Sequence, residues 1–424
     1  MLRELNTTTN IKKWWNQFPA KLRRITICRF LASIGAGGVL YLTPLVFNSL
    51  SFSGTQIGLG FCAAAIAGTI SRLFTGIWLD KGISFSTPLR VAALFAVTAD
   101  LVLFGAYTTT RYLLGEVFLG CAAGFYWPSV ELAVPICCEN ISSSKGFALA
   151  RSADALGVSI GALIGSLSST IGHIRFVYVI EILCMCLLIA LISNKKFYNF
   201  AKNNSMVKNK ATKISLVPRI DKIYSLIKTL YPIIIISILG TGVLCLMQIG
   251  LQLDLAKGGI YRPAIEDSSI SWIVAYKLIL LLVIQWPIGR WLSERNVKLG
   301  LKLCLINFSI GSLILCISSF YINGLFLFST GLIAISIGIA MFLPTATETI
   351  VQVSPLEQRG ISMAIYSQCF GISFLIFPII AGKIIDNQGT GMLLWLLISI
   401  CSLLVYPLTN RINPINKVKV KINN

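Results

Sequence analysis

Twelve apolar stretches, each long enough to cross a lipid bilayer, run through this chain of 424 residues. A helix needs about 20 apolar residues to span the hydrocarbon core. In the first half the stretches are Ile25–Asn48, Gly54–Leu79, Thr87–Tyr107, Thr109–Cys137, Gly146–Ile171 and Phe176–Ser193. In the second half they are Leu230–Leu253, Ser268–Leu292, Leu299–Phe320, Asn323–Val353, Gly360–Ile385 and Gly391–Asn410. The pattern predicts an all-α integral membrane protein with twelve transmembrane helices.

Composition excludes several other classes of protein. Charged residues make up 12% of the chain, whereas soluble domains carry roughly 25%. The 12 Cys and 34 Gly follow no period, which argues against a disulfide scaffold or a collagen. The chain has a single histidine, His173, no CxxC pair and no phosphate-binding GxxxxGK[ST] loop. We therefore expect no metal, no cofactor, no ATP-driven pumping and no enzymatic site.

The positive charge is concentrated in tails and connections. Basic residues cluster at Arg3–Arg24, Lys195–Lys228 and Arg411–Lys421, and the formal net charge is +20. Basic clusters between apolar spans mark cytoplasmic loops, and anionic lipid is their usual partner, so we expect a lipid bilayer and no nucleic acid. Both termini should be cytoplasmic. The first 24 residues lack an apolar core, so no cleavable signal is visible, and Lys- and Asn-rich tails favour a bacterial inner membrane.

The spans divide into two groups of six. We expect an N-terminal six-helix bundle over residues 1–193, a cytoplasmic basic linker over 194–228 and a C-terminal six-helix bundle over 229–424. The linker lacks an apolar run and is rich in Lys, Asn and Ser, which is typical of a solvated connection. Its last part, Ile220–Ile227, has the pattern of a short amphipathic helix lying on the membrane.

The two halves resemble each other in sequence. Gly76 and Asp80 after the second span correspond to Gly289 and Glu294 after the eighth, 213 and 214 residues later. Pro128 in the fourth span corresponds to Pro344 in the tenth, and Lys145-Gly146 corresponds to Arg359-Gly360. A nearly constant offset with the same topology is the mark of parallel repeats, a common architecture of transporters.

These features resemble the major facilitator superfamily (MFS) of secondary transporters over essentially the whole chain. Gly76, Asp80 and Lys81 match the family signature between the second and third spans, although the following glycine spacing and basic pair are missing. The resemblance implies a conformational gate in which Asp80 faces the helix N-terminus at Arg359-Gly360, because an anion there interacts favourably with the helix dipole. The alternative is a solvated turn with a charge at a helix end.

The fourth and fifth spans depart from the family pattern. The frame set by Gly120, Gly124 and Pro128 places Glu116 where the family has arginine, and a rival register uses Arg111 instead. In the fifth span the family's drug/proton antiporters carry Gly-Pro and Gly-Gly pairs. Here small residues recur every four positions without the proline, which favours close helix packing over an antiport motif. These residues are Gly157, Gly161 and Gly165.

Ionisable side chains inside spans are costly and therefore candidates for function. We assign proton coupling to Glu116, Asp100 and Glu181. Glu116 lies roughly 10 Å below the outer surface when counted from Thr109. A structural ion pair of Glu116 with Arg111 or Lys277 is the alternative. Candidates for the lining of a central substrate cavity are Tyr41, Tyr126, Trp127, Gln248, Trp272, Tyr276 and Lys277.

The predicted function is secondary active transport by alternating access. Aromatic and Met-bearing spans with few buried charges favour export of small amphipathic compounds by proton antiport. One alternative is proton-coupled or facilitative uptake of a small polar nutrient such as a sugar, nucleoside or organic acid. A membrane receptor or enzyme on the same scaffold is a more remote one. We expect a small-molecule substrate, a proton and a monomer.

Overall fold

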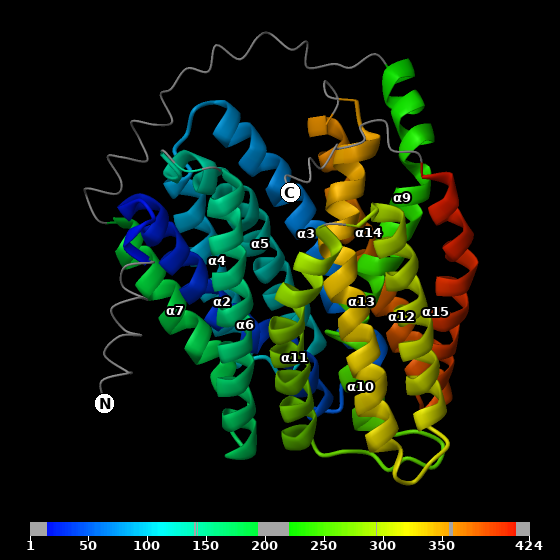
Figure 1. Ribbon diagram of the computed structural model, residues 1–424. Coiled ribbons are helices and arrows are strands. Elements are labelled where there is room, and N and C mark those ends of the chain that lie inside the picture. Colours follow the sequence, from blue (N-terminus) through cyan, green and yellow to red (C-terminus); the bar gives the residue numbers. More distant parts are fainter. Residues whose placement is uncertain are drawn as a thin grey trace, which may run out of the picture. The chain divides into compact units, whose positions relative to one another are not determined.

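The computed structural model describes residues 15–139, 141, 143–193, 220–293, 295–355 and 359–412. Twelve helices in this part are long and apolar enough to cross a membrane, and the same part holds no β-strand (Figure 1). The first six are α2 (Ala20–Asn48), α3 (Gly54–Asp80), α4 (Ser86–Phe104), α5 (Thr109–Cys137), α6 (Ser143–Thr170) and α7 (Phe176–Ser193). The others are α9 (Ile220–Leu246), α11 (Asp267–Ser293), α12 (Val297–Ser318), α13 (Gly324–Val353), α14 (Arg359–Gln388) and α15 (Met392–Val405). The predicted fold class is confirmed.

Most predicted span boundaries lie within a few residues of the helix ends. A segment that spans a membrane must pair its own backbone polar groups, so an apolar stretch of this kind favours a helix over its whole length. Side-chain caps fix some of the starts. Thr108 accepts a hydrogen bond from the backbone N–H of Arg111 before α5, and Asn296 does so from Lys298 before α12. The predicted amphipathic stretch Ile220–Ile227 forms the first turns of α9 rather than a separate helix.

The seventh span contains an interruption that the sequence analysis did not predict. Helix α9 ends at Leu246, and the short helix α10 (Gly250–Lys257) begins after a turn at 247–249. Ile249 leaves helical geometry with φ −122° and ψ −59°, just before Gly250, a residue with low helix propensity. The last span changes its helix type without a break, since α15 is followed directly by the 3-10 helix η2 (Tyr406–Arg411).

The chain forms two compact units. The first comprises residues 1–43 and 63–211, and the second comprises residues 44–62 and 212–424. The hairpin between α2 and α3 therefore belongs to the second unit, although it lies early in the sequence. Within the first unit α4 packs against α5 and α7, and within the second α12 packs against α13 and α15 while α9 packs against α14.

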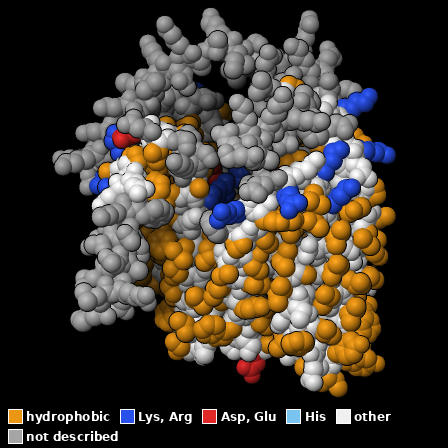
Figure 2. Space-filling model, viewed as in Figure 1, with side chains coloured by type: hydrophobic (Ala, Val, Ile, Leu, Met, Phe, Trp, Pro, Cys, Tyr) orange, Lys and Arg blue, Asp and Glu red, His pale blue; other side chains and the backbone are white. Residues whose placement is uncertain are grey.

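The side chains are distributed as a membrane protein requires. On the face shown in Figure 2, hydrophobic side chains cover the flanks of the helices, and Lys and Arg gather toward one end. Large apolar side chains with high exposure occur along many spans, among them Leu73, Leu101 and Leu183. Such exposure is unfavourable in water but neutral in lipid, so these flanks fit a hydrocarbon surrounding.

Candidate functional site

Three buried carboxyl groups lie inside the first unit. Asp100 comes from α4, Glu116 from α5 and Glu181 from α7, and their exposed fractions are 0%, 1% and 2%. Asp100 and Glu181 are close enough to interact electrostatically. Neither oxygen of Asp100 has a hydrogen-bond partner within the described chain. These are the three residues to which the sequence analysis assigned proton coupling.

Two tyrosines lie close to Glu116, and one of them also interacts with Asp100. Tyr112 lies one turn before Glu116 on α5, and its hydroxyl faces that carboxyl, although neither Glu116 oxygen meets hydrogen-bond geometry. Tyr178 interacts electrostatically with both Glu116 and Asp100, and its hydroxyl lies 3.2 Å from Thr43 Oγ1. The carboxyl groups and phenols therefore form one buried polar region between α2, α4, α5 and α7.

A glycine makes room for this region. A Cβ on Gly35 of α2 would lie 2.9 Å from both Cα and Cγ of Glu181. No salt bridge in the described part of the chain joins any of the three carboxyl groups to a cation. Arg111, one of the cations weighed as a partner of Glu116, instead donates to the Gly105 carbonyl at 3.4 Å.

In a separate cluster of the first unit, each charged side chain lies next to a side chain of opposite charge. Arg29 on α2 is fully buried and bonds Asp154 on α6 with two guanidinium nitrogens, of which Nε lies 3.1 Å from Oδ1. Glu131 on α5 lies 3.5 Å from Arg29 and 3.1 Å from Arg151. Two arginines and two acids form a neutral network, which is how buried charges are accommodated.

Two of the predicted cavity residues adjoin this network. The Arg29 guanidinium lies 5.8 Å from the centre of the Trp127 ring, and Trp127 is 37% exposed. The buried Tyr126 hydroxyl has no hydrogen-bond partner in the described residues. Tyr41, also predicted to line the cavity, is half-buried on α2.

Of the remaining cavity candidates, Lys277 and Gln248 lie at the interruption of the seventh span. Lys277 on α11 is buried, and its ammonium donates to the Met247 carbonyl at 2.7 Å. This carbonyl lies in the turn between α9 and α10, next to the half-buried Gln248. Trp272 and Tyr276 lie one turn apart on an exposed face of α11, at 42% and 43% exposure. Interrupted spans are typical positions for binding sites in transporters, because they release backbone groups.

The predicted glycine stripe lies where α6 approaches α2. A Cβ on Gly157 would lie 2.6 Å from the Phe30 carbonyl oxygen, and one on Gly161 would overlap the carbonyl oxygen of Ile34. A Cβ on Gly165 would overlap the Leu42 side chain in the same way. This is the geometry expected of a stripe that lets two helices pack closely.

For the predicted gate the structure describes the backbone and the exposed side chain of Lys81. Gly76 and Asp80 lie in the last turns of α3, Lys81 follows it, and Arg359 and Gly360 begin α14. The side chains of Asp80 and Arg359 lie outside the described residues.

A carboxylate at the other end of the same two helices was not predicted. Asp386 of α14 accepts hydrogen bonds from the backbone N–H groups of Gly54 and Thr55 at 2.8 and 2.7 Å, and from the Thr55 hydroxyl at 2.6 Å. All three residues belong to the second unit. A Cβ on Gly382 would overlap the Gly54 carbonyl oxygen, so the helices meet through their backbones. We call this contact the Asp386 clamp.

A second unpredicted cluster is fully buried in the second unit. Asp254 at the end of α10 lies 2.9 Å from Arg262, and it also accepts hydrogen bonds from Gly391 N at 3.0 Å and Trp395 Nε1 at 2.9 Å. Arg262 also donates to Ser318 and stacks over Phe328. Within the described residues no group of three His, Cys, Asp or Glu side chains is placed to hold a metal ion.

Twelve helices long and apolar enough to span a bilayer define a polytopic, all-α membrane architecture, and comparisons with known proteins agree with it. The model of the Major Facilitator Superfamily matches residues 223–419. An uncharacterised MFS-type transporter of Methanocaldococcus jannaschii is 21% identical over 369 residues, which are 86% of this chain and 91% of that protein. The chain therefore resembles MFS transporters, by the family model in its second half and by this relative over most of its length.

Other relatives differ in what their names say they transport. Multidrug resistance protein 1 of Bacillus subtilis is 28% identical over 138 residues, covering 32% of this chain and 35% of that protein. A solved mutant of the nucleoside transporter NupG superposes with a TM-score of 0.77 at 15% identity, covering 93% of this chain and all of that one. A POT family transporter in complex with 5-aminolevulinic acid gives a TM-score of 0.71 at 12% identity, with 93% and 97% covered. The two structures establish the fold.

Proposed function

We propose that this transporter exports small amphipathic compounds in exchange for protons, by alternating access, across the inner membrane of a bacterium. The observation that supports it is the set of three buried carboxyl groups, Asp100, Glu116 and Glu181, without a cation partner in the described residues. A buried carboxyl group without a cation is stabilised by protonation, and it loses the proton again when water or a cation reaches it. Such a group is suited to carrying a proton across a membrane.

The proposed substrate class rests on the lining candidates. Trp127, Trp272 and Tyr276 present exposed aromatic surfaces, which suit ligands with large apolar parts. The partial similarity to a Bacillus subtilis multidrug resistance protein points in the same direction. Lys277 of α11, which bonds the turn that interrupts the seventh span, supplies one polar group that could orient the substrate.

Uptake of a small polar nutrient is the second candidate. Its support is the interruption at Met247–Ile249, which places a carbonyl group, Gln248 and Lys277 together, a polar arrangement suited to a hydroxylated or anionic solute. The structural similarity to a nucleoside transporter shows a shared fold.

Transport by reconstituted protein separates these functions. Proteoliposomes with an imposed proton gradient are supplied with a lipophilic cationic dye or with a radiolabelled nucleoside. Exchange of dye against protons supports the proposal, and accumulation of nucleoside with protons supports the second candidate. Absence of any proton movement in both assays contradicts proton coupling.

The variant Glu116→Gln tests the coupling residue itself. It should abolish gradient-driven dye transport but preserve downhill exchange, because the amide occupies the same space and carries no proton. Glu139→Gln is the matched control, since Glu139 is exposed and forms a surface salt bridge with Lys21. Normal driven transport in the Glu116 variant would show that this carboxyl group does not carry the proton.

A further inference from the structure

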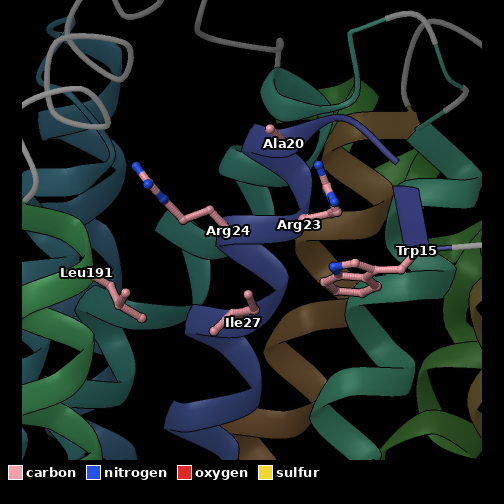
Figure 3. A pocket seen from close by; sticks show the side chains of 6 residues that line it. All are labelled: Trp15, Ala20, Arg23, Arg24, Ile27 and Leu191. Carbon is pink, nitrogen blue, oxygen red and sulfur yellow. The ribbon is translucent and has the colours of Figure 1, made fainter. Parts of the chain in front are cut away.

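A pocket of about 340 Å³ opens in the first unit where α2 begins and α7 ends (Figure 3). Five of its lining residues come from α2 and the segment just before it, and one comes from α7. They are Trp15, Ala20, Arg23, Arg24, Ile27 and Leu191. None of them belongs to the transport site proposed above.

The pocket is polar at one end and apolar at the other. In Figure 3 the guanidinium groups of Arg23 and Arg24 extend toward one end, and Ile27 and Leu191 lie farther along the helices. Ile27 is 41% exposed, and Trp15 and Leu191 are half-buried. A tryptophan beside arginines at the end of a span is typical of the interface between headgroups and acyl chains.

Several positive groups lie in and around the pocket. Arg23 donates to Asn16, a neutral amide, and its Nε is buried with no partner in the described residues. Arg90 of α4 reaches the carbonyl of Ile192, the residue after Leu191, at 3.4 Å. The first turn of α2 contains no acidic residue, so its helix dipole adds to the positive potential.

We propose that this pocket binds the phosphate headgroup of an anionic phospholipid. Arg23 and Arg24 hold the phosphate through charge-assisted hydrogen bonds, and Trp15, Ile27 and Leu191 contact the glycerol and the upper acyl chain. The phosphate of a soluble anion offers the same charge, but it has no apolar part to cover Ile27 and Leu191. The apolar wall therefore favours a lipid over a free phosphate.

Lipid binding to the purified full-length transporter tests this assignment. Native mass spectrometry in detergent is carried out with phosphatidylglycerol, phosphatidylcholine and glycerol 3-phosphate. Phosphatidylglycerol should bind in a saturable manner, and the other two should bind at least tenfold more weakly. If glycerol 3-phosphate bound as tightly as phosphatidylglycerol, the ligand of the pocket would be a soluble anion and not a lipid. If phosphatidylcholine bound as tightly, the negative charge of the headgroup would not determine binding.

Variants connect the binding to this pocket. Arg23→Gln combined with Arg24→Gln should weaken phosphatidylglycerol binding about 25-fold, since each basic residue near an anionic lipid contributes about a fivefold factor. Arg290→Gln combined with Arg295→Gln removes the same charge from exposed positions at the end of α11 and serves as the control. Equal loss in both pairs, or no loss in the first, would overturn the assignment. Thermal unfolding of both variants verifies that they remain folded.

Discussion

Two buried polar regions of this protein accommodate buried charge in opposite ways. In the second unit Asp254 is fully buried but has a cation, a backbone N–H and an indole N–H as partners. In the first unit Asp100 is equally buried, yet its neighbour is another acid, Glu181, and both of its oxygens lack hydrogen bonds within the described residues. The first arrangement stabilises one structure, whereas the second is the one that we propose for a change of protonation.

The two regions also differ in what they connect. Asp254 and Arg262 join α10 to the start of α15, the end of α12 and, through Phe328, α13. This network fastens several helices of one unit at one end. The carboxyl groups of the first unit come from three helices but make no comparable bonds between them. A residue with every partner in place is suited to a scaffold, and one without partners is suited to a step that changes its charge.

The largest effect is expected where a paired charge loses its partner. Asp254→Asn should lower the free energy of unfolding by about 3 to 5 kcal/mol, because it leaves the buried guanidinium of Arg262 uncompensated. Denaturant unfolding in detergent measures the change. Glu266→Gln is the control, since Glu266 is exposed in the loop that carries Arg262. A change below about 1 kcal/mol in the Asp254 variant would remove the distinction between the two regions.

The carboxyl groups of the first unit should respond differently. Asp100→Asn should change the free energy of unfolding by about 1 kcal/mol or less, because an amide resembles a protonated carboxyl group and no cation loses a partner. It should nevertheless reduce gradient-driven transport more than tenfold. Asp154→Asn in the same unit is the contrasting variant, since it deprives the buried Arg29 of its bidentate partner and should destabilise the protein strongly. Similar losses of stability in both variants would contradict a functional role for Asp100.

The Asp386 clamp is an intermediate case, since its carboxylate is held by backbone N–H groups and a hydroxyl rather than by a cation. Asp386→Asn should favour separation of the α2–α3 hairpin from α14 by about 1 kcal/mol, which is a population change of about fivefold. Spin labels at Ser49 and Asn387 report this distance, and both positions are exposed. Distance distributions identical to those of the unmodified protein would show that the clamp does not control this contact.

The smallest effect is expected at the proposed gate. Asp80→Asn removes one anion that we propose faces the N-terminus of α14, and an interaction of this kind contributes about 0.3 to 1 kcal/mol when exposed. Labels at Lys81 and Pro355 should show a population change of about two- to fivefold. Lys81→Gln, labelled at Gly82 and Pro355, is the control for altered charge in the same turn. No difference between the variants would favour the alternative of a solvated helix end.

The sequence by itself determined the twelve spans. Length and apolarity are local properties, and the bilayer requires each span to pair its own backbone groups, so neither depends on distant contacts. The same holds for the selection of Asp100, Glu116 and Glu181, because a charged residue well inside an apolar stretch is visible without a structure. The family resemblance likewise rested on local motifs such as Gly76 and Asp80.

Only the tertiary structure decided which charges have partners. Asp254 forms a salt bridge with Arg262, eight residues away, and accepts a hydrogen bond from Trp395, 141 residues away. Asp386 accepts a hydrogen bond from Gly54, which lies in the opposite half of the sequence. The turn after α9, with Lys277 bonded to the Met247 carbonyl, also has no strong local signal, since no proline marks it. These contacts depend on how helices pack, and the energy of a buried charge depends on the partners that packing supplies.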